Sequence, residues 1–390
     1  MEDIRFLLDL ISVRTECTTK EGYEEAASLI KEKLSDMGLS VEIYDGEEVV
    51  KDGKPRPNVV AKLDLKADKT ILLNAHYDVV PAGKGWSKDP FKPVIEENVV
   101  YGRGASDDKS GITAIIWAIN ELGEKAKRNV ILAFTCDEEV GGRAGLGYLM
   151  REVGIRADEA LIVDGGFDAI YVGASGIVAG KIGVKGVQGH AGYPHLAKNP
   201  IYPLAKAIVK LEEYTRLREK KLSKLKSPPG SPHPYVWGRF SITVLRAGEK
   251  SNVIPGEAEA TFDLRLIPEE DVDEAIEDLK NYLTEVSSEI GWKVELLKYE
   301  GGGNYYTEIT HPFVVGFSKA VERVIGKRLE YAAELGGNDG RYTKEKNIPT
   351  LVFGPIARDS RFHGVDEFVR IKDVRMVKEV ILRYLKEEAI

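Results

Sequence analysis

The sequence predicts an α/β fold in which a mostly parallel sheet carries helices on both faces and a smaller α+β domain is inserted into the chain. In residues 1–176, strand-like apolar runs alternate with helical patterns, and the same style returns after residue 301. Between these parts the order is strand, helix, two strands, helix, strand, which is typical of a ferredoxin-like antiparallel sheet backed by two helices. We therefore predict a main domain formed by residues 1–176 and 301–390 and an inserted domain at residues 177–300.

Apolar spacing predicts each element of the main domain in turn. The predicted helices cover residues 2–13, 24–37, 112–122, 146–152, 313–325 and 374–388. The predicted strands cover residues 41–44, 59–63, 70–75, 160–163 and 350–354. A further strand begins at Val130 and ends on three consecutive acids, Asp137, Glu138 and Glu139, which we interpret as its extended tip.

The inserted domain follows the same rules of spacing. Its predicted strands cover residues 182–187, 239–245, 257–266 and 293–297, and its predicted helices cover residues 201–221 and 269–290. The segment 226–234 is rich in Pro, Ser and Gly and is expected to be a loop.

Composition excludes several classes of protein. The 390 residues are 43% hydrophobic and 30% charged, as in ordinary globular proteins. A net charge of -8 argues against nucleic acid or an anionic membrane as partner. The acidic start, Met1-Glu2-Asp3, is unlike a secretory signal, and no run of 18 apolar residues occurs, so we expect a cytoplasmic protein. The chain has only 2 Cys and 4 Met beside abundant Lys and Glu, a composition typical of proteins from hot environments.

Groups that bind cations stand where predicted strands end. His76 and Asp78 follow one strand, Glu138 and Glu139 another and Asp164 a third, while Asp107 precedes a helix and His363 follows the last strand. A single such residue is usually a solvated loop residue, but the carboxyl ends of parallel strands meet at one crevice. Imidazole and carboxylate ligands without thiolate favour zinc, and cobalt and manganese also fit.

Three motifs carry a resemblance to a known family. They are His-x-Asp at residues 76–78, Gly-Arg-Gly-x-x-Asp-x-Lys-x-Gly at 102–111 and Asp-Glu-Glu-x-Gly-Gly at 137–142. With a later strand-end acid and a late His, the chain resembles the dinuclear zinc hydrolases that include succinyl-diaminopimelate desuccinylase, acetylornithine deacetylase, aminoacylase and glutamate-releasing carboxypeptidases. The resemblance implies two Zn²⁺ per chain, bridged by Asp107. It implies that His76 and Asp164 complete one site and that Glu139 and His363 complete the other.

The resemblance also implies how the residues act. A water shared by the metals attacks an amide carbonyl, and Glu138 is the general base that moves its proton. We expect Glu138 to point away from Glu139 because neighbours in extended chain face opposite sides. Asp78 is expected to orient the imidazole of His76, although a loop-capping role is its alternative.

The inserted domain supplies further candidates by resemblance. Residues 186–195 are similar to the desuccinylase branch, which implies that His190 reaches the active site of a second subunit and polarises the scissile carbonyl. A turn residue is the alternative for His190, and His195 is left without a role. Asn252 and Arg265 are expected to contact the substrate carbonyl or carboxylate, with a buried salt bridge as the alternative for Arg265. By the same resemblance, Gly337 and Arg341 of the loop 336–341 are expected to contact the substrate, but the loop matches the desuccinylase motif only with a shift or a one-residue deletion.

Departures from the family pattern bear on the substrate. Residues 173–177 read Gly-Ala-Ser-Gly-Ile, where desuccinylases carry Gly-Arg-Arg-Gly-Ser. We therefore predict a homodimeric amidohydrolase that releases an amino acid from an N-acyl or peptide precursor with a free carboxylate, and for which succinyl-diaminopimelate is a poor substrate. The alternatives are a true succinyl-diaminopimelate desuccinylase and a non-catalytic binding protein. A glycosidase using Glu138 and Glu139 is disfavoured because adjacent extended residues diverge.

Overall fold

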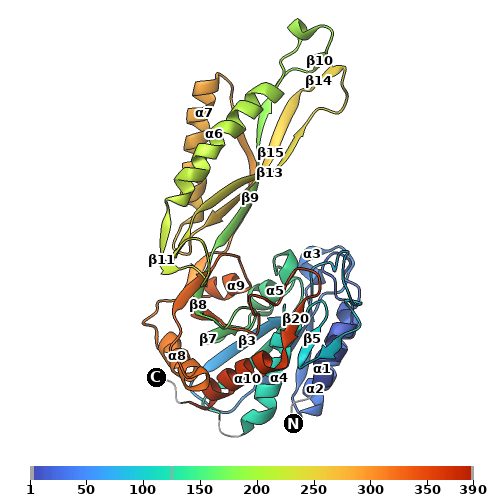
Figure 1. The fold of residues 1–390 in the computed structure, drawn as a ribbon, viewed down its shortest axis with the longest axis vertical. Coiled ribbons are helices and arrows are strands. Elements are labelled where there is room, and N and C mark those ends of the chain that lie inside the picture. The colour runs from blue at the N-terminus through green and yellow to red at the C-terminus, as the bar shows by residue number, and fades with distance from the viewer. Residues whose placement is uncertain (1–3, 124–125, 388–390) are drawn as a thin grey trace. The chain divides into compact units, whose positions relative to one another are not determined.

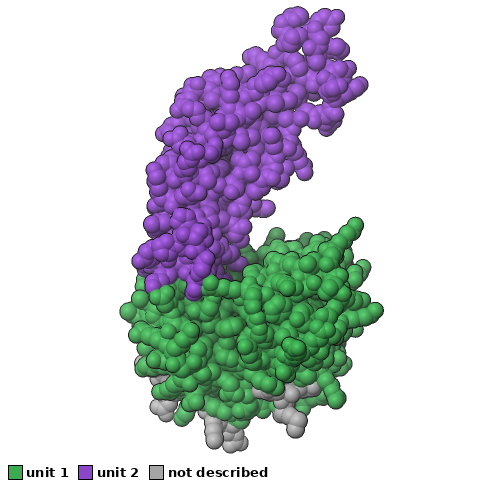
Figure 2. All heavy atoms as spheres, viewed as in Figure 1, with its two compact units in different colours: residues 1–173, 306–332, 338–390 green, residues 174–305, 333–337 purple. Residues whose placement is uncertain are grey.

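The computed structural model describes residues 4–123 and 126–387, which form two compact units (Figure 2). Unit 1 contains residues up to Gly173 together with Tyr306–Ala332 and the residues from Asn338 onward, and unit 2 contains Ala174–Tyr305 and Ala333–Gly337. The sequence places the boundaries at residues 176 and 301, a few residues away, and does not predict that the short segment 333–337 belongs to unit 2. Residues 2, 3 and 388 of the predicted terminal helices lie outside the described residues.

Unit 1 is built on a mixed sheet whose centre is parallel (Figure 1). The strand order is β1-β2-β6-β3-β7-β19-β8, and the pairs β6–β3, β3–β7 and β7–β19 are parallel, whereas the flanking pairs are antiparallel. The strands of this order are β1 Val41–Asp45, β2 Pro57–Leu63, β3 Thr70–His76, β6 Asn129–Thr135, β7 Glu159–Ile162, β8 Ile170–Ala174 and β19 Thr350–Val352. The predicted α/β class, with a mostly parallel sheet, is confirmed.

Helices cover both faces of this sheet. On one side, Leu72, Ala160 and Ile162 pack against the segment around Tyr148–Met150 and against Tyr342 in one apolar cluster. On the other side lies α4, which is buried along almost its whole length and packs against β3, α1 and α10. The helices of unit 1 are α1 Ile4–Ser12, α2 Tyr23–Asp36, α3 Glu47–Val50, α4 Lys109–Leu122, α5 Leu146–Tyr148 with its continuation η3 Leu149–Val153, α8 Pro312–Ile325, α9 Gly340–Lys344 and α10 Ile371–Lys386.

Several short elements of unit 1 are not predicted by the sequence. Strands β4 Val94–Glu96, β5 Val99–Tyr101 and β20 Phe368–Arg370 form a separate three-stranded sheet. Because each has only three residues, apolar periodicity is too short to reveal it. The expected extended tip at Glu138 and Glu139 is wrong: β6 ends at Thr135, Asp137 has a positive φ of 61°, and Glu138–Val140 form a 3₁₀ turn, η2.

Unit 2 has the ferredoxin-like arrangement that the sequence predicts. Its four-stranded antiparallel sheet has the order β13-β15-β9-β16, and the apolar sides of its two long helices join the sheet residues in one core. The elements of unit 2 are β9 Gly176–Lys185, β10 Gly189–His190, η4 Pro194–Leu196, α6 Ile201–Glu219, β11 Leu222–Lys226, β12 Tyr235–Trp237, β13 Arg239–Ala247, β14 Val253–Ile254, β15 Glu257–Leu266, α7 Val272–Ile290 and β16 Glu295–Gly302. Strands β17 Tyr305–Tyr306 and β18 Tyr331–Glu334 lie at the unit boundaries.

Among the described residues, no helix is both long enough and apolar enough to cross a bilayer.

Candidate metal centre

Five side chains that the sequence singles out as metal ligands meet in unit 1. His76 is the last residue of β3, Glu139 lies in the turn after β6 and Asp164 follows β7 by two residues. These three parallel strands are neighbours in the sheet, so their carboxyl ends meet at one edge. Asp107 enters from the loop before α4, and His363 from the segment between β19 and β20. The structure thus brings together all five predicted ligands.

The five side chains form two overlapping groups that share Asp107. The first group is His76, Asp107 and Asp164, and the second is Asp107, Glu139 and His363, with the ligand atoms of each group within 4.8 Å of one another. Nε2 of His76 lies 3.1 Å from Oδ1 of Asp107, and Nε2 of His363 lies 3.1 Å from Oδ2 of the same carboxylate. The two oxygens of Asp107 therefore face two different imidazoles, as a bridging carboxylate requires.

Burial and mutual repulsion shift the pKa values of these groups. Burial raises the pKa of Glu139 to about 7, and burial together with the nearby Asp107 raises the pKa of Asp164 well above its ordinary value. Hydrogen bonds to Asp107 and Glu139 raise the pKa of His363 to about 10. For His76, burial opposes the charged form, but hydrogen bonds to Asp107 and Asp78 outweigh burial and raise its pKa.

This donor set fits divalent cations. The carboxylates of Asp107, Glu138, Glu139 and Asp164 converge with Asp78 and Asp108, both fully buried, and repel one another. Buried carboxylates gathered in this way need protons, hydrogen-bond donors or bound cations to stabilise them. Two imidazoles and three carboxylates without thiolate match the ligand preferences of zinc.

Asp78 links the two ligand-bearing turns. Its carboxylate accepts hydrogen bonds from the backbone N–H groups of Glu138 and Glu139, each at 3.2 Å. Its backbone carbonyl lies 2.9 Å from Nδ1 of His76, whereas its carboxylate is 3.4 Å from the same nitrogen. Asp78 therefore holds the His76 ring mainly through its carbonyl, and its carboxylate fixes the turn that carries Glu138.

The turn itself explains how Glu138 and Glu139 diverge. Asp137 is buried and accepts hydrogen bonds from Nε of Arg56 at 2.5 Å and from the hydroxyl of Tyr23 at 3.1 Å, and Nζ of Lys20 lies 2.7 Å away. The first of the three consecutive acids is thus an anchor. It starts a tight turn in which Glu138 and Glu139 are successive helical residues, rather than residues on opposite sides of a strand.

Glu367 is a functional residue that sequence reasoning missed. It is completely buried, and its carboxylate accepts hydrogen bonds from the backbone N–H groups of Gly104, Ser106 and Asp107 at 2.8–3.0 Å and from Nη1 of Arg103 at 2.6 Å. Glu367 lies four residues after His363, so it ties the loop of one ligand to the segment of another. The one feature of the sequence that could have pointed to Glu367 is its position as an acid four residues after the predicted ligand His363.

The segment around Arg341 also borders the centre. Asp339 is buried with no hydrogen-bond partner for either carboxylate oxygen, and burial followed by the negative charge of Glu138 raises its pKa. Burial raises the pKa of Glu138 against the opposing effects of His76 and of the guanidinium of Arg341. Arg341 is therefore near Glu138 within unit 1, whereas Gly337 belongs to unit 2, where it packs against Ser175 and Ile177.

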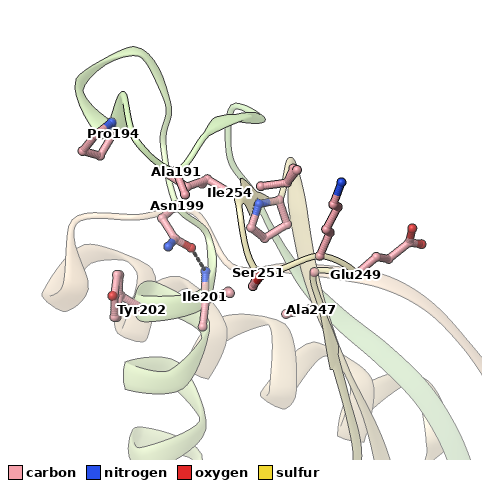
Figure 3. A pocket seen from close by; sticks show the side chains of 13 residues that line it. Ala191, Pro194, Asn199, Ile201, Tyr202, Ala247, Glu249, Ser251 and Ile254 are labelled. Atoms are coloured by element: carbon pink, nitrogen blue, oxygen red, sulfur yellow. Dashed lines mark hydrogen bonds between the residues drawn. The ribbon is translucent and has the colours of Figure 1, made fainter.

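The candidates of unit 2 lie at its two ends. His190 in β10 pairs with Val253 in β14, and the backbone of Ala191 donates to the carbonyl of Asn252 at 2.9 Å, so His190 and Asn252 are close together. Both are exposed, beside a surface pocket of about 620 Å³ that Ala191, Ser251 and Tyr202 help to line (Figure 3). Arg265 is near the opposite end of β15, where it pairs with Ile177. One small molecule cannot contact Asn252 and Arg265 of the same unit.

Comparisons with known proteins agree with this arrangement. The family model "Peptidase family M20/M25/M40" matches residues 72–387. A succinyl-diaminopimelate desuccinylase of Sulfurovum sp. (strain NBC37-1) is 30% identical over 357 residues, covering 88% of this chain and 90% of that protein. An uncharacterized metallohydrolase of Methanocaldococcus jannaschii is 28% identical over 397 residues, covering 94% of each.

Solved structures share the fold across both units. An M20 family metallo-carboxypeptidase, Sso-CP2, of Sulfolobus solfataricus superposes with a TM-score of 0.78 at 21% identity, covering 99% of both chains. The dipeptidase Dug1p of Saccharomyces cerevisiae superposes with a TM-score of 0.75 at 18% identity, covering 98% of this chain and 95% of that one. The chain therefore belongs to the peptidase family M20/M25/M40, a family of metallohydrolases.

Proposed function

We propose that the protein is a dinuclear zinc amidohydrolase that cleaves the amide bond of an N-acyl amino acid or small peptide with a free carboxylate. The observation that carries the proposal is the pair of ligand groups that share Asp107, with Glu138 beside them. His76, Asp107 and Asp164 would hold one cation and Asp107, Glu139 and His363 the other. Bound there, the cations supply Lewis acidity to the amide carbonyl and lower the pKa of water. Cobalt or manganese would be held by the same donors.

Glu138 is the general base of this proposal. Its carboxyl is next in sequence to a ligand, and the two N–H bonds to Asp78 fix the backbone that carries both. Burial raises the pKa of Glu138, which brings it closer to the pH at which a base both accepts and returns a proton. Glu138 takes the proton of the attacking water and delivers it to the leaving nitrogen. Asp78 acts by positioning Glu138 and His76.

His190 is proposed to stabilise the oxyanion in a partner subunit. Nδ1 of His190 accepts a hydrogen bond from the N–H of Gly192 at 3.0 Å, so the proton of the neutral ring is on Nε2, which is then a donor. Ten residues of β15 span about 30 Å at about 3.3 Å per residue, which separates His190 and Asn252 from Arg265 within one unit. A homodimer in which each unit 2 lends its tip to the other chain resolves this separation.

The substrate proposal favours simple N-acyl amino acids and peptides. Relatives and structural neighbours carry the names desuccinylase, carboxypeptidase and dipeptidase, which share hydrolysis of an amide. Residues 173–177 contain no arginine, so we expect a substrate with several carboxylates, such as succinyl-diaminopimelate, to bind weakly. The alternatives remain a desuccinylase proper and a non-catalytic binding protein.

A panel assay with one variant tests this proposal. The metal-loaded protein is assayed on N-acyl amino acids, dipeptides and succinyl-diaminopimelate, and Glu138→Gln is compared with wild type. We expect hydrolysis of the first two classes, with kcat about 10²–10⁴-fold lower in Glu138→Gln at unchanged metal content. Full activity of Glu138→Gln would show that Glu138 is not the general base. If succinyl-diaminopimelate were the substrate turned over fastest, the alternative of a desuccinylase proper would be favoured. Metal binding without hydrolysis of any amide would favour the binding protein.

A further inference from the structure

Two arginines face each other on the sheet of unit 2. Arg239 in β13 is the direct register partner of Arg265 in β15, so their side chains lie on the same face. The neighbouring residues Phe240 and Leu264 point into the core formed with α6 and α7. Because side chains alternate along a strand, the arginines lie on the face that these helices do not cover. Like charges directly opposite each other destabilise a sheet, so this arrangement calls for a compensating group.

The residues around the pair do not compensate its charge. Asp263 pairs with Nε of Arg265 at 2.7 Å, and no described residue forms an ion pair with Arg239. Nη2 of Arg239 donates to the hydroxyl of Ser175 at 2.7 Å, its guanidinium lies 5.2 Å from the ring centre of Trp237, and its Nε is buried without a partner. Burial, followed by repulsion from Arg265, lowers the pKa of Arg239 to about 10. Two guanidiniums thus share one carboxylate.

The chemistry of this pair suits a carboxylate. Guanidinium groups bind carboxylates through two parallel N–H···O bonds, and Arg265 uses its Nε for Asp263, which leaves its terminal amino groups for a ligand. Ser175 uses its oxygen to accept from Arg239, so its own proton is available to an anion. Gly337 packs beside Ser175 and Ile177, and a side chain there would crowd the same segment.

We propose that Arg239 joins Arg265, the contact that the resemblance implies, in binding the free carboxylate of the substrate, and that Arg239 is the specificity-determining residue. The inference rests on the proposed function and adds to it the residue that selects amides bearing a carboxylate over their neutral carboxamides. Residues 173–177 contain no arginine, and Arg239 brings a guanidinium to Ser175 within that segment. The requirement for a carboxylate thus arises from β13, a strand of this chain for which the sequence gives no site.

Kinetics on matched acid and amide ligands test the inference. Wild type and Arg239→Gln, both metal-loaded, are assayed on N-acetyl amino acids, and the corresponding N-acetyl amino acid carboxamides are measured as substrates or competitive inhibitors. We expect Arg239→Gln to raise KM for the acids about tenfold, which is about 1.4 kcal/mol, with kcat unchanged and the carboxamides unaffected. Arg239→Lys should recover part of the loss, because it restores charge but not the planar fork.

Two controls separate recognition from folding. Arg216→Gln removes an exposed arginine of α6 and should leave KM for the acids and the binding of the carboxamides unchanged. Ser175→Ala removes the hydroxyl that accepts from Arg239 and should raise KM for the acids by less than Arg239→Gln does. If Arg239→Gln weakened the acids and the carboxamides equally, or did not raise KM for the acids at all, the inference would be overturned.

Binding without turnover separates this inference from the proposed function. Calorimetric titration of Glu138→Gln with N-acetyl amino acids should show binding that Arg239→Gln weakens about tenfold, even if wild type hydrolyses none of them. That result would support the anion site while the proposed function fails. Equal binding of acids and carboxamides to Glu138→Gln would overturn the anion site whatever the activity.

Discussion

The metal centre of unit 1 and the arginine pair of unit 2 are opposite in charge and alike in design. In unit 1, Asp107, Glu139 and Asp164 meet with too few cations, and their protein partners are two imidazoles. In unit 2, Arg239 and Arg265 meet with too few anions, and Asp263 is the one carboxylate that the described residues pair with them. By contrast, the buried guanidinium of Arg218 meets the carboxylate of Glu270 within its own unit, at 2.6 Å. Charge left uncompensated therefore marks a place for a ligand and indicates the sign of that ligand.

Removal of the cations should have the largest effect on unit 1. Chelation is expected to abolish activity and to lower the stability of the protein by about 4 kcal/mol at cation concentrations about 1,000-fold above Kd, because the converging carboxylates then repel without compensation. The melting temperature with and without chelator measures this, and added Zn²⁺ should restore it. An unchanged melting temperature after proven loss of metal would contradict the account of the acid cluster.

Loss of His190 should reduce kcat and leave the metal centre and the arginine pair unchanged. If its imidazole donates to the oxyanion, His190→Ala lowers kcat about 10²–10³-fold. Mixed dimers of His190→Ala and Glu138→Gln then provide a sharper test, since one of their two sites has an intact base and receives an intact imidazole from the other chain. Random reassortment should restore about a quarter of wild-type activity. No recovery in proven mixed dimers would show that His190 does not act across the interface.

Loss of Glu367, which links the loop of Asp107 to the segment of His363, should have a smaller effect than loss of the cations or of His190. Glu367→Gln removes the charge that accepts from three backbone N–H groups and Arg103, so the loop of Asp107 loses its support. Metal affinity should fall about 10–100-fold, as for other residues that orient ligands. Competition with a chromophoric chelator measures the affinity. Glu322→Gln on the exposed side of α8 is the matched control, and an equal affinity in both variants would make Glu367 a purely structural residue.

The ligands of the metal centre could be predicted because their signal is local. His76 ends one aliphatic strand and Asp164 follows another by two residues, and parallel strands bring their carboxyl ends to one edge. The extended chain from which the divergence of Glu138 and Glu139 is predicted is wrong, since apolar periodicity does not show that Asp137 turns the chain after Thr135. The anchoring of Asp137 by Arg56 and Tyr23 joins residues about 80 and 114 positions apart, which no local pattern reveals.

The arginine pair could not be predicted, because it depends on register. The sequence shows Arg239 as the first residue of a strand and Arg265 near the end of another, and only the antiparallel pairing of β13 with β15 sets them opposite each other. A shift of one residue would have placed Arg239 on the other face, in the apolar core. The length of β15 keeps Asn252 and Arg265 apart within one chain, so the prediction that both contact the substrate requires Asn252 to come from a partner subunit.

The stoichiometry of bound metal tests the central claim most directly. Elemental analysis of wild type, His363→Ala and Asp107→Ala, purified in parallel and dialysed against the same zinc buffer, counts the cations per chain. Because Asp107 faces both imidazoles, we predict about two cations for wild type, about one for His363→Ala and none for Asp107→Ala, with unit 2 folded in all three. A single cation in wild type, or a cation retained at full affinity in Asp107→Ala, would contradict a bridged dinuclear centre.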